Sequence, residues 1–105
     1  MNDVTTQVHF TITDDELEVS VPPTLEPLGD FLETEVGASG AVLDLIEHAV
    51  RHDRTWHFTG NTCHLHLDAE MATIEHAYTR ARTTLSRTDL RTLLAELRTL
   101  LTAQS

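Results

Sequence analysis

The fold is decided by the stretch TWHFTGNTCHLHLDAEMATIEHAY, residues 55–78. Its apolar and polar residues alternate with the period of two that is typical of half-buried β-strands. A tight turn at Gly60-Asn61 would join two such strands, because glycine and asparagine tolerate the backbone angles of these turns. This hairpin has an apolar face, Trp56, Phe58, Cys63, Leu65 and Leu67, and a polar face, Thr55, His57, Thr59, Thr62, His64 and His66.

A third strand is expected directly after this hairpin. A turn at residues 68–69 would place Leu65 opposite Ala72. In that register Glu70 falls on the apolar side, so a β-bulge near Glu70 is expected.

An earlier hairpin of the same design is predicted over residues 8–21. Asp14 and Asp15 suit its turn, because aspartate tolerates the left-handed conformation and bonds its own backbone. That turn sets Ile12 opposite Leu17. The apolar face then holds Val8, Phe10, Ile12, Leu17, Val19 and Val21, and the polar face holds His9, Thr11, Thr13, Glu16, Glu18 and Ser20.

Helices are predicted between and after the hairpins. One begins at Pro27, since proline is favoured in a first turn. Residues 37–40, GASG, indicate a break, with Ser39 as the cap of a second helix. The alternative is a single kinked helix over residues 27–52.

The last helix carries the strongest helical periodicity in the chain. Ser86 or Thr88 is expected to cap it, and residues 79–85 are interpreted as a connection. Its stripe is predicted to be core, or alternatively a homodimer seam, and consists of Leu90, Leu93, Leu94, Leu97, Leu100 and Leu101.

These elements predict one α+β domain over residues 1–105. Their order is ββ-α(α)-βββ-α. Because each strand pair has one polar side, helices are needed only on the apolar side. We therefore expect an antiparallel sheet of about five strands with helices packed on one face.

Five residues of the central stretch stand in a distinctive order and spacing: Trp56, Gly60, Leu65, Asp68 and Glu70. Their arrangement resembles that of the YacL-like proteins, which are small acidic bacterial cytosolic proteins of unknown function. Segments 31–36 and 42–50 also look similar, so the resemblance covers about residues 31–76. Ala69 departs from the family's usual glycine, and the leucine stripe has no counterpart there. The resemblance implies a shared fold and carries over no activity, cofactor or site residue.

The charge of the chain is strongly negative. It has 17 acidic residues against 7 basic ones, all arginine, and a formal net charge of −10. Residues 1–50 hold 11 of the acids and no arginine. Nucleic-acid binding needs clustered Lys and Arg, and anionic membranes would repel this charge. The charge favours a basic protein partner instead.

The localisation predicted from the sequence is cytoplasmic. No apolar run approaches a membrane span of about 18 residues, and the polar N-terminus does not resemble a signal peptide. Cys63 is the lone cysteine and cannot form an internal disulfide. On the predicted apolar face it would pack as a small hydrophobe, as suits a reducing compartment.

Seven histidines raise the question of a metal site or an enzyme. His57, His64 and His66 share the polar face, with His57 expected opposite His64, and could bind Zn²⁺ or Ni²⁺ with His9 nearby. The favoured interpretation is a solvated polar face with no metal and no cofactor. His48 and His52 form an i,i+4 pair without the glutamate of a metalloprotease motif. No nucleophile or phosphate-loop motif is present, so an enzyme is not predicted.

The favoured function is that of an immunity-type or antitoxin-like inhibitor of a basic toxin domain, for example a nuclease. Alternatives are a YacL-like housekeeping or regulatory homodimer, a small secretion chaperone or adaptor, and, less favoured, a histidine-based metal-binding domain. The residues predicted to bind the partner are Asp14, Asp15, Glu16, Glu18, Glu26, Asp30, Glu33 and Glu35.

Overall fold

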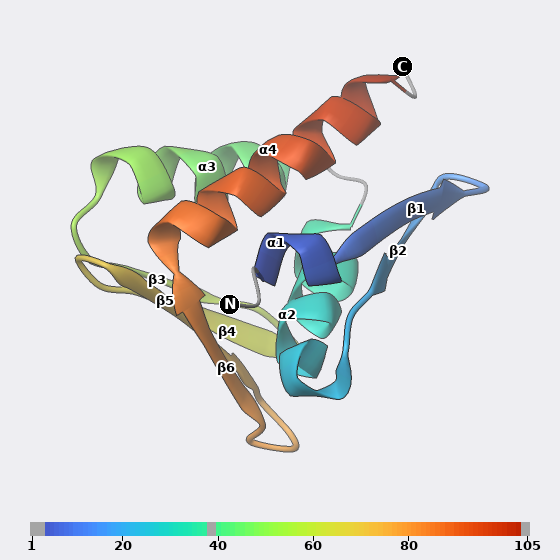
Figure 1. Ribbon diagram of the computed structural model, residues 1–105. Helices are drawn as coiled ribbons and strands as arrows, with labels where there is room; N and C mark the ends of the chain where they lie inside the picture. The colour runs from blue at the N-terminus through green and yellow to red at the C-terminus, as the bar shows by residue number, and fades with distance from the viewer. Residues whose placement is uncertain (1–3, 38–39, 104–105) are drawn as a thin grey trace.

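The computed structural model describes residues 4–37 and 40–103 of the chain. Its architecture is α+β, as predicted. A four-stranded sheet carries its helices on one face, and a separate two-stranded hairpin extends beyond them (Figure 1). The elements in order are α1 Val4–Gln7, β1 His9–Thr13, β2 Glu16–Ser20, the 3-10 turn η1 Pro23–Leu25, α2 Glu26–Phe31, the π-helical turn η2 Leu32–Val36, α3 Gly40–His52, β3 Trp56–Thr59, β4 Cys63–Leu67, β5 Met71–His76, β6 Arg82–Ser86 and α4 Arg87–Ala103.

The first hairpin, β1–β2, has the predicted register. Ile12 pairs with Leu17 across a two-residue turn. Asp14 and Asp15 form that turn in the left-handed region, with φ of 53° and 67°. The prediction succeeded because the turn chemistry is local and aspartate accepts these angles.

The second hairpin, β3–β4, turns one residue later than predicted. Gly60 N–H donates to the Cys63 carbonyl at 3.0 Å, so residues 61–62 form the turn. His57 therefore lies opposite His66, and the predicted pairing of His57 with His64 is wrong. The two faces are unchanged, because each residue's partner shifts by two positions.

The third strand also pairs differently from the prediction. Leu65 lies opposite Ile74 rather than Ala72, and Glu70 sits in the turn. The Asp68 carboxylate accepts hydrogen bonds from the N–H groups of Glu70 and Met71, at 2.9 and 2.7 Å. These bonds lower the pKa of Asp68. They also fix the turn in which Glu70 lies. The predicted bulge near Glu70 is therefore wrong, because β4 and β5 pair regularly on either side of this turn.

Residues 79–85 are not merely a connection, because β6 begins at Arg82. Six strands run through the described residues, divided into sheets of order β1-β2 and β3-β4-β5-β6. Thr83 and Leu85 of β6 are buried, and Thr83 Oγ1 donates to the Thr24 carbonyl at 3.0 Å. The sequence does not predict this short strand, because Leu85 is its one apolar residue and the apolar alternation is therefore weak.

The helical region breaks where the GASG stretch predicted. Gly37 has φ of 54°, a left-handed angle that glycine adopts without strain, and α3 begins at Gly40. Two helices are therefore present rather than one kinked helix. Ser39, the predicted cap, lies outside the described residues. For α4 the cap is Ser86, whose Oγ accepts from the Asp89 N–H at 3.0 Å.

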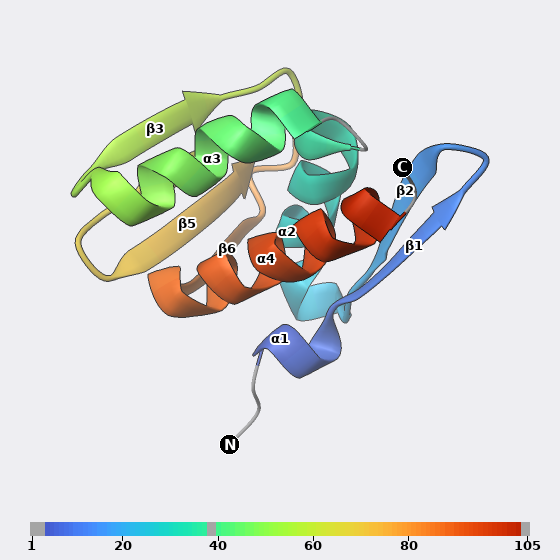
Figure 2. The same ribbon diagram turned by 90° about the horizontal axis from the view of Figure 1, so that it is seen from above.

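The leucine stripe of α4 belongs to the core of this chain. Figure 2 shows α3 and α4 side by side above the four-stranded sheet. Four leucines of the stripe are at most 1% exposed, and they are Leu90, Leu93, Leu94 and Leu97. Little of the stripe therefore remains for the predicted homodimer seam.

Arg87, at the start of α4, joins that helix to the end of α3. Its Nη1 donates to the carbonyls of Arg54 and Asp68, at 2.8 and 2.7 Å. Its Nη2 faces three further carbonyls, those of Ala49, Val50 and Asp53, at 3.2, 2.7 and 2.7 Å. The guanidinium thus occupies the negative end of the α3 dipole, where the last carbonyls of a helix commonly lack partners.

Candidate functional site

Four exposed acids occupy the tip and outer side of the first hairpin. We call Asp14, Asp15, Glu16 and Glu18 the acidic hairpin surface. The hairpin extends away from the helices (Figures 1 and 2). None of the ion pairs within residues 4–37 and 40–103 involves these four carboxylates. Their negative field is therefore not neutralised locally.

A shallow hollow of about 530 Å³ follows β2 beside this surface. Glu16, Glu18 and Glu33 line it, together with Thr11 and Ser20. A hollow whose charged lining is entirely carboxylate suits the guanidinium or ammonium groups of a partner.

The other predicted partner-binding acids differ in how the fold uses them. Glu26 is exposed in the first turn of α2. Asp30 is half-buried, with Oδ2 3.9 Å from His76 Nε2. Glu33 Oε1 accepts from the Val19 N–H at 2.6 Å, and Glu35 Oε1 accepts from the Thr62 N–H at 2.9 Å.

Glu33 and Glu35 connect the two hairpins through η2. The bond from Val19 holds β2 to η2, and the bond from Thr62 holds the β3–β4 turn to the same segment. A Cβ added to Gly60 would lie 1.9 Å from Glu35 Oε2, so glycine makes room for this carboxylate. Of the acids predicted to bind a partner from the first helical stretch, Glu26 is exposed and its carboxylate makes no described hydrogen bond or ion pair, whereas Glu33 and Glu35 bind backbone N–H groups of this chain.

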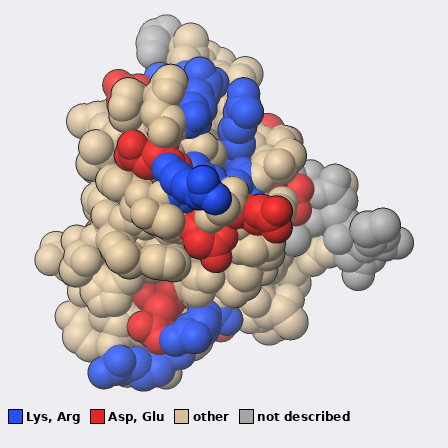
Figure 3. Space-filling model, turned by 90° about the vertical axis from the view of Figure 1, so that its left-hand side faces the viewer, with Lys and Arg blue, Asp and Glu red and all other residues tan. Residues whose placement is uncertain are grey.

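No ion pair of the described residues joins an arginine to the acidic hairpin surface, and several arginines are paired with other acids. Arg98 bonds to Glu47 and Asp44, and Arg82 bonds to Glu75 at 3.0 Å. Figure 3 shows arginine and acidic side chains next to one another on the face that it presents. This mixed surface contrasts with the purely acidic hairpin tip.

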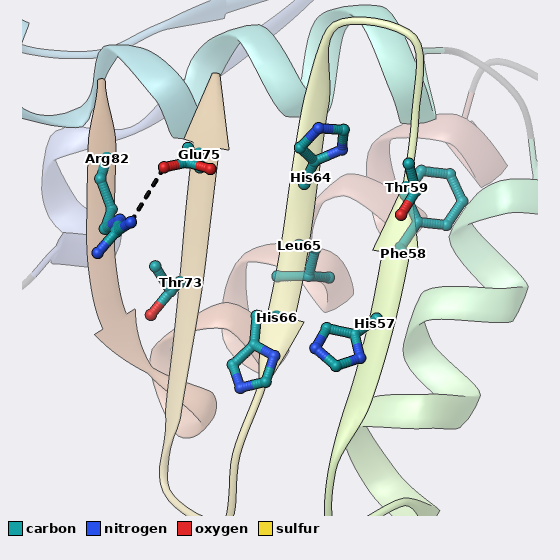
Figure 4. Close-up of a pocket in the computed structure, with 9 residues that line it drawn as sticks. All are labelled: His57, Phe58, Thr59, His64, Leu65, His66, Thr73, Glu75 and Arg82. Atoms are coloured by element: carbon teal, nitrogen blue, oxygen red, sulfur yellow. Dashed lines mark hydrogen bonds and ion pairs between the residues drawn. The ribbon is translucent and has the colours of Figure 1, made fainter. Parts of the chain in front are cut away.

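The outer face of the four-stranded sheet forms a second candidate site. A hollow of about 390 Å³ opens on it (Figure 4). His57 and His66 are neighbours there, with ring centroids 4.3 Å apart. His64 lies farther along β4, where its strand neighbours are Thr59 and Glu75. The full lining is His57, Phe58, Thr59, His64, Leu65, His66, Thr73, Glu75 and Arg82.

The three histidines of this face do not converge on one point. Within the described part of the chain, no group of three or more His, Cys, Asp or Glu side chains is placed to hold a metal ion. His9 belongs to the separate two-stranded sheet and does not join them. His64 Nδ1 is buried and has no hydrogen-bond partner. Glu75 and Arg82 are not among the site residues predicted from the sequence, and Arg82 falls in the segment that the sequence predicts to be a connection.

Cys63 packs on the apolar face, as predicted. Its side chain is fully buried, and Sγ lies 3.9 Å from the Pro27 carbonyl. Burial, with the nearby carboxylates of Asp30 and Glu35, raises the pKa of this thiol to about 11. A neutral, inaccessible thiol is a poor nucleophile.

Comparisons with protein-family models, with curated proteins and with solved structures give no match for this chain. The resemblance to YacL-like proteins therefore stays a prediction. Across residues 4–37 and 40–103, no helix combines the length and apolar character that crossing a membrane requires.

Proposed function

We propose that this protein is an acidic inhibitor that binds a basic protein partner through its first hairpin. The observation that carries the proposal is the acidic hairpin surface, four exposed carboxylates without a cationic partner in the described chain. Unneutralised charge on a projecting element attracts a partner of opposite charge over a distance of about a Debye length.

The partner class that fits best is a basic toxin domain, for example a nuclease. Proteins that grip phosphate carry clustered Lys and Arg. Carboxylates at hydrogen-bonding distance can take the place of phosphate oxygens on those groups. The hairpin backbone is well suited to this, since its turn is fixed by two aspartates and β2 is held to η2 by Glu33.

The test begins with affinity capture from cells that express the protein. Three baits are compared: the wild type, Glu16→Lys/Glu18→Lys, and the control Glu70→Lys/Glu96→Lys. Each double variant changes the net charge from −10 to −6, because each substitution removes one negative charge and adds one positive charge. All four glutamates are exposed, and none belongs to a described ion pair.

The proposal predicts that one basic protein is retained by the wild type and by the control bait and is lost from the hairpin variant. Equal loss from both double variants would show that bulk charge, not the hairpin, is responsible. Equal retention by all three baits would contradict a role for the hairpin carboxylates. Capture of acidic or neutral proteins alone would contradict the proposed partner class. Asp14 and Asp15 are left unchanged, since lysine at their positive φ angles would strain the turn.

A further inference from the structure

A histidine pair on the outer face of the four-stranded sheet is not used by the proposed function. His57 in β3 and His66 in β4 are direct cross-strand partners. Their ring centroids lie 4.3 Å apart, and the ring planes meet at 42°. Figure 4 shows the two rings next to each other on the exposed side of the sheet.

The ring nitrogens of this pair are open for coordination. Both side chains are exposed, and no described hydrogen bond or ion pair uses either imidazole. A neutral imidazole keeps one nitrogen lone pair, which is the metal-binding form. Exposure also leaves both side chains free to rotate toward a common ligand.

We propose that His57 and His66 form a two-nitrogen site for a divalent transition-metal ion, with copper(II) preferred. Directly opposed residues of an antiparallel pair have Cβ atoms about 5 Å apart, so two imidazoles can reach one ion at about 2.0–2.1 Å. Imidazole suits zinc, copper and nickel, and divalent affinities peak at copper. Water completes the coordination, because the protein supplies only two ligands.

The surroundings favour a cation at this position. Glu75 in the same hollow is paired with Arg82 at 3.0 Å, which leaves that arginine neutralised. Thr73, the β5 neighbour of His66, adds a hydroxyl to the hollow that can hold a metal-bound water. The negative charge of the whole chain also raises the local concentration of cations.

The chain contains a matched comparison in His48 and His52 on α3. Their ring centroids lie 4.6 Å apart with 41° between the planes, almost the geometry of the sheet pair. Arg51 and Arg98 line the hollow beside them, and each is paired with an acid of that hollow. Asp44 and Glu47, the acids of that hollow, are already bonded to Arg98.

The test is copper(II) binding to the full chain, prepared without a histidine tag and measured by calorimetry and electron paramagnetic resonance. We expect one tightest site whose spectrum shows nitrogen ligation. His57→Ala and His66→Ala should each weaken it at least about tenfold, since even outer-shell partners of metal ligands are worth that much. His48→Ala should leave it unchanged, and far-ultraviolet circular dichroism checks that each variant folds.

Three results would overturn the assignment. They are no copper binding by the wild type, unchanged affinity in both His57→Ala and His66→Ala, and loss of the tightest site in His48→Ala. His64→Ala supplies a further check. A large loss of copper affinity in this variant would contradict the assignment, because it would place the ion farther along β4, near Glu75. All of these variants keep the acidic hairpin surface intact, so their outcome is independent of partner binding.

Discussion

Arg87 is expected to contribute more to stability than any other arginine of the chain. The perturbation is Arg87→Ala, which removes the guanidinium that joins α4 to the end of α3. Two nitrogens contact five carbonyls, but they carry only four hydrogens, so Nη2 is shared among its three acceptors. The part-buried Val50 carbonyl would then depend on water, whereas the Ala49 carbonyl would keep its hydrogen bond from the Asp53 N–H.

The expected loss follows from these contacts. A charged hydrogen bond contributes about 1.5–3 kcal/mol, but bonds that share one group do not add. Water can also reach part of the site, because Arg87 is not fully buried. We therefore expect Arg87→Ala to lower the free energy of unfolding by about 2–4 kcal/mol. Arg87→Lys should retain less than half of this stabilisation, because one ammonium group cannot reach both the carbonyls that Nη1 contacts and those that Nη2 contacts.

Urea unfolding followed by circular dichroism measures this loss. The control is Arg91→Ala, which removes the same charge one turn later on α4. Arg91 is exposed and has no described partner, so a change within about 0.5 kcal/mol is expected. A loss of less than about 1 kcal/mol in Arg87→Ala, or one no larger than in Arg91→Ala, would refute this role of Arg87.

Three further predictions concern the carboxylates and the thiol. Gly60→Ala should lower the free energy of unfolding by about 1–2 kcal/mol in the wild type, because the added methyl group displaces the Glu35 carboxylate from the Thr62 N–H. The same substitution should have a much smaller effect in a Glu35→Ala background. Additive losses of stability in the double variant would contradict this coupling. The pKa of Asp68 is lowered in the folded state, so the ionised carboxylate stabilises the fold above its ordinary pKa, and this stabilisation is lost as the pH falls through the folded-state pKa. The difference in unfolding free energy between the wild type and Asp68→Asn should therefore shrink in acid. A difference that stays constant with pH would contradict this role of Asp68. The pKa of Cys63 is raised from 9.0 to about 11, so the wild type should lose stability between those pH values relative to Cys63→Ala, and iodoacetamide should modify the thiol only after unfolding.

The parts of the fold that could be predicted from sequence are those fixed by local chemistry. The Asp14-Asp15 turn set the register of the first hairpin, and the leucine stripe identified α4 and its buried side. The GASG break depended on glycine at a positive φ. In each case the deciding residues belong to one short segment of the sequence.

The errors arose where groups distant in sequence decide the structure. The β3–β4 turn is bonded to Glu35, 27 residues before Thr62, and no pattern within the hairpin reveals this contact. The same holds for Glu33, 14 residues after Val19. Exposure of the acidic hairpin surface could be predicted from alternation, but the structural use of Glu33 and Glu35 could not.

The histidine face illustrates a finer limit. Alternation correctly placed His57, His64 and His66 on one side of the sheet. Which two become neighbours depends on the register, and a shift of two positions exchanged His64 for His66 as the partner of His57. The face could therefore be predicted, while the pair could not.

The central claim is that the first hairpin binds a basic partner, and the association rate constant with the captured partner tests it most directly. Stopped-flow measurements at low and at physiological ionic strength would compare the wild type, Glu16→Lys/Glu18→Lys and Glu70→Lys/Glu96→Lys. We expect the hairpin variant to associate at least about tenfold more slowly than the wild type at low salt, and the control to remain close to the wild type. Added salt should reduce the difference in association rate. Equal rates for the two double variants would contradict the account.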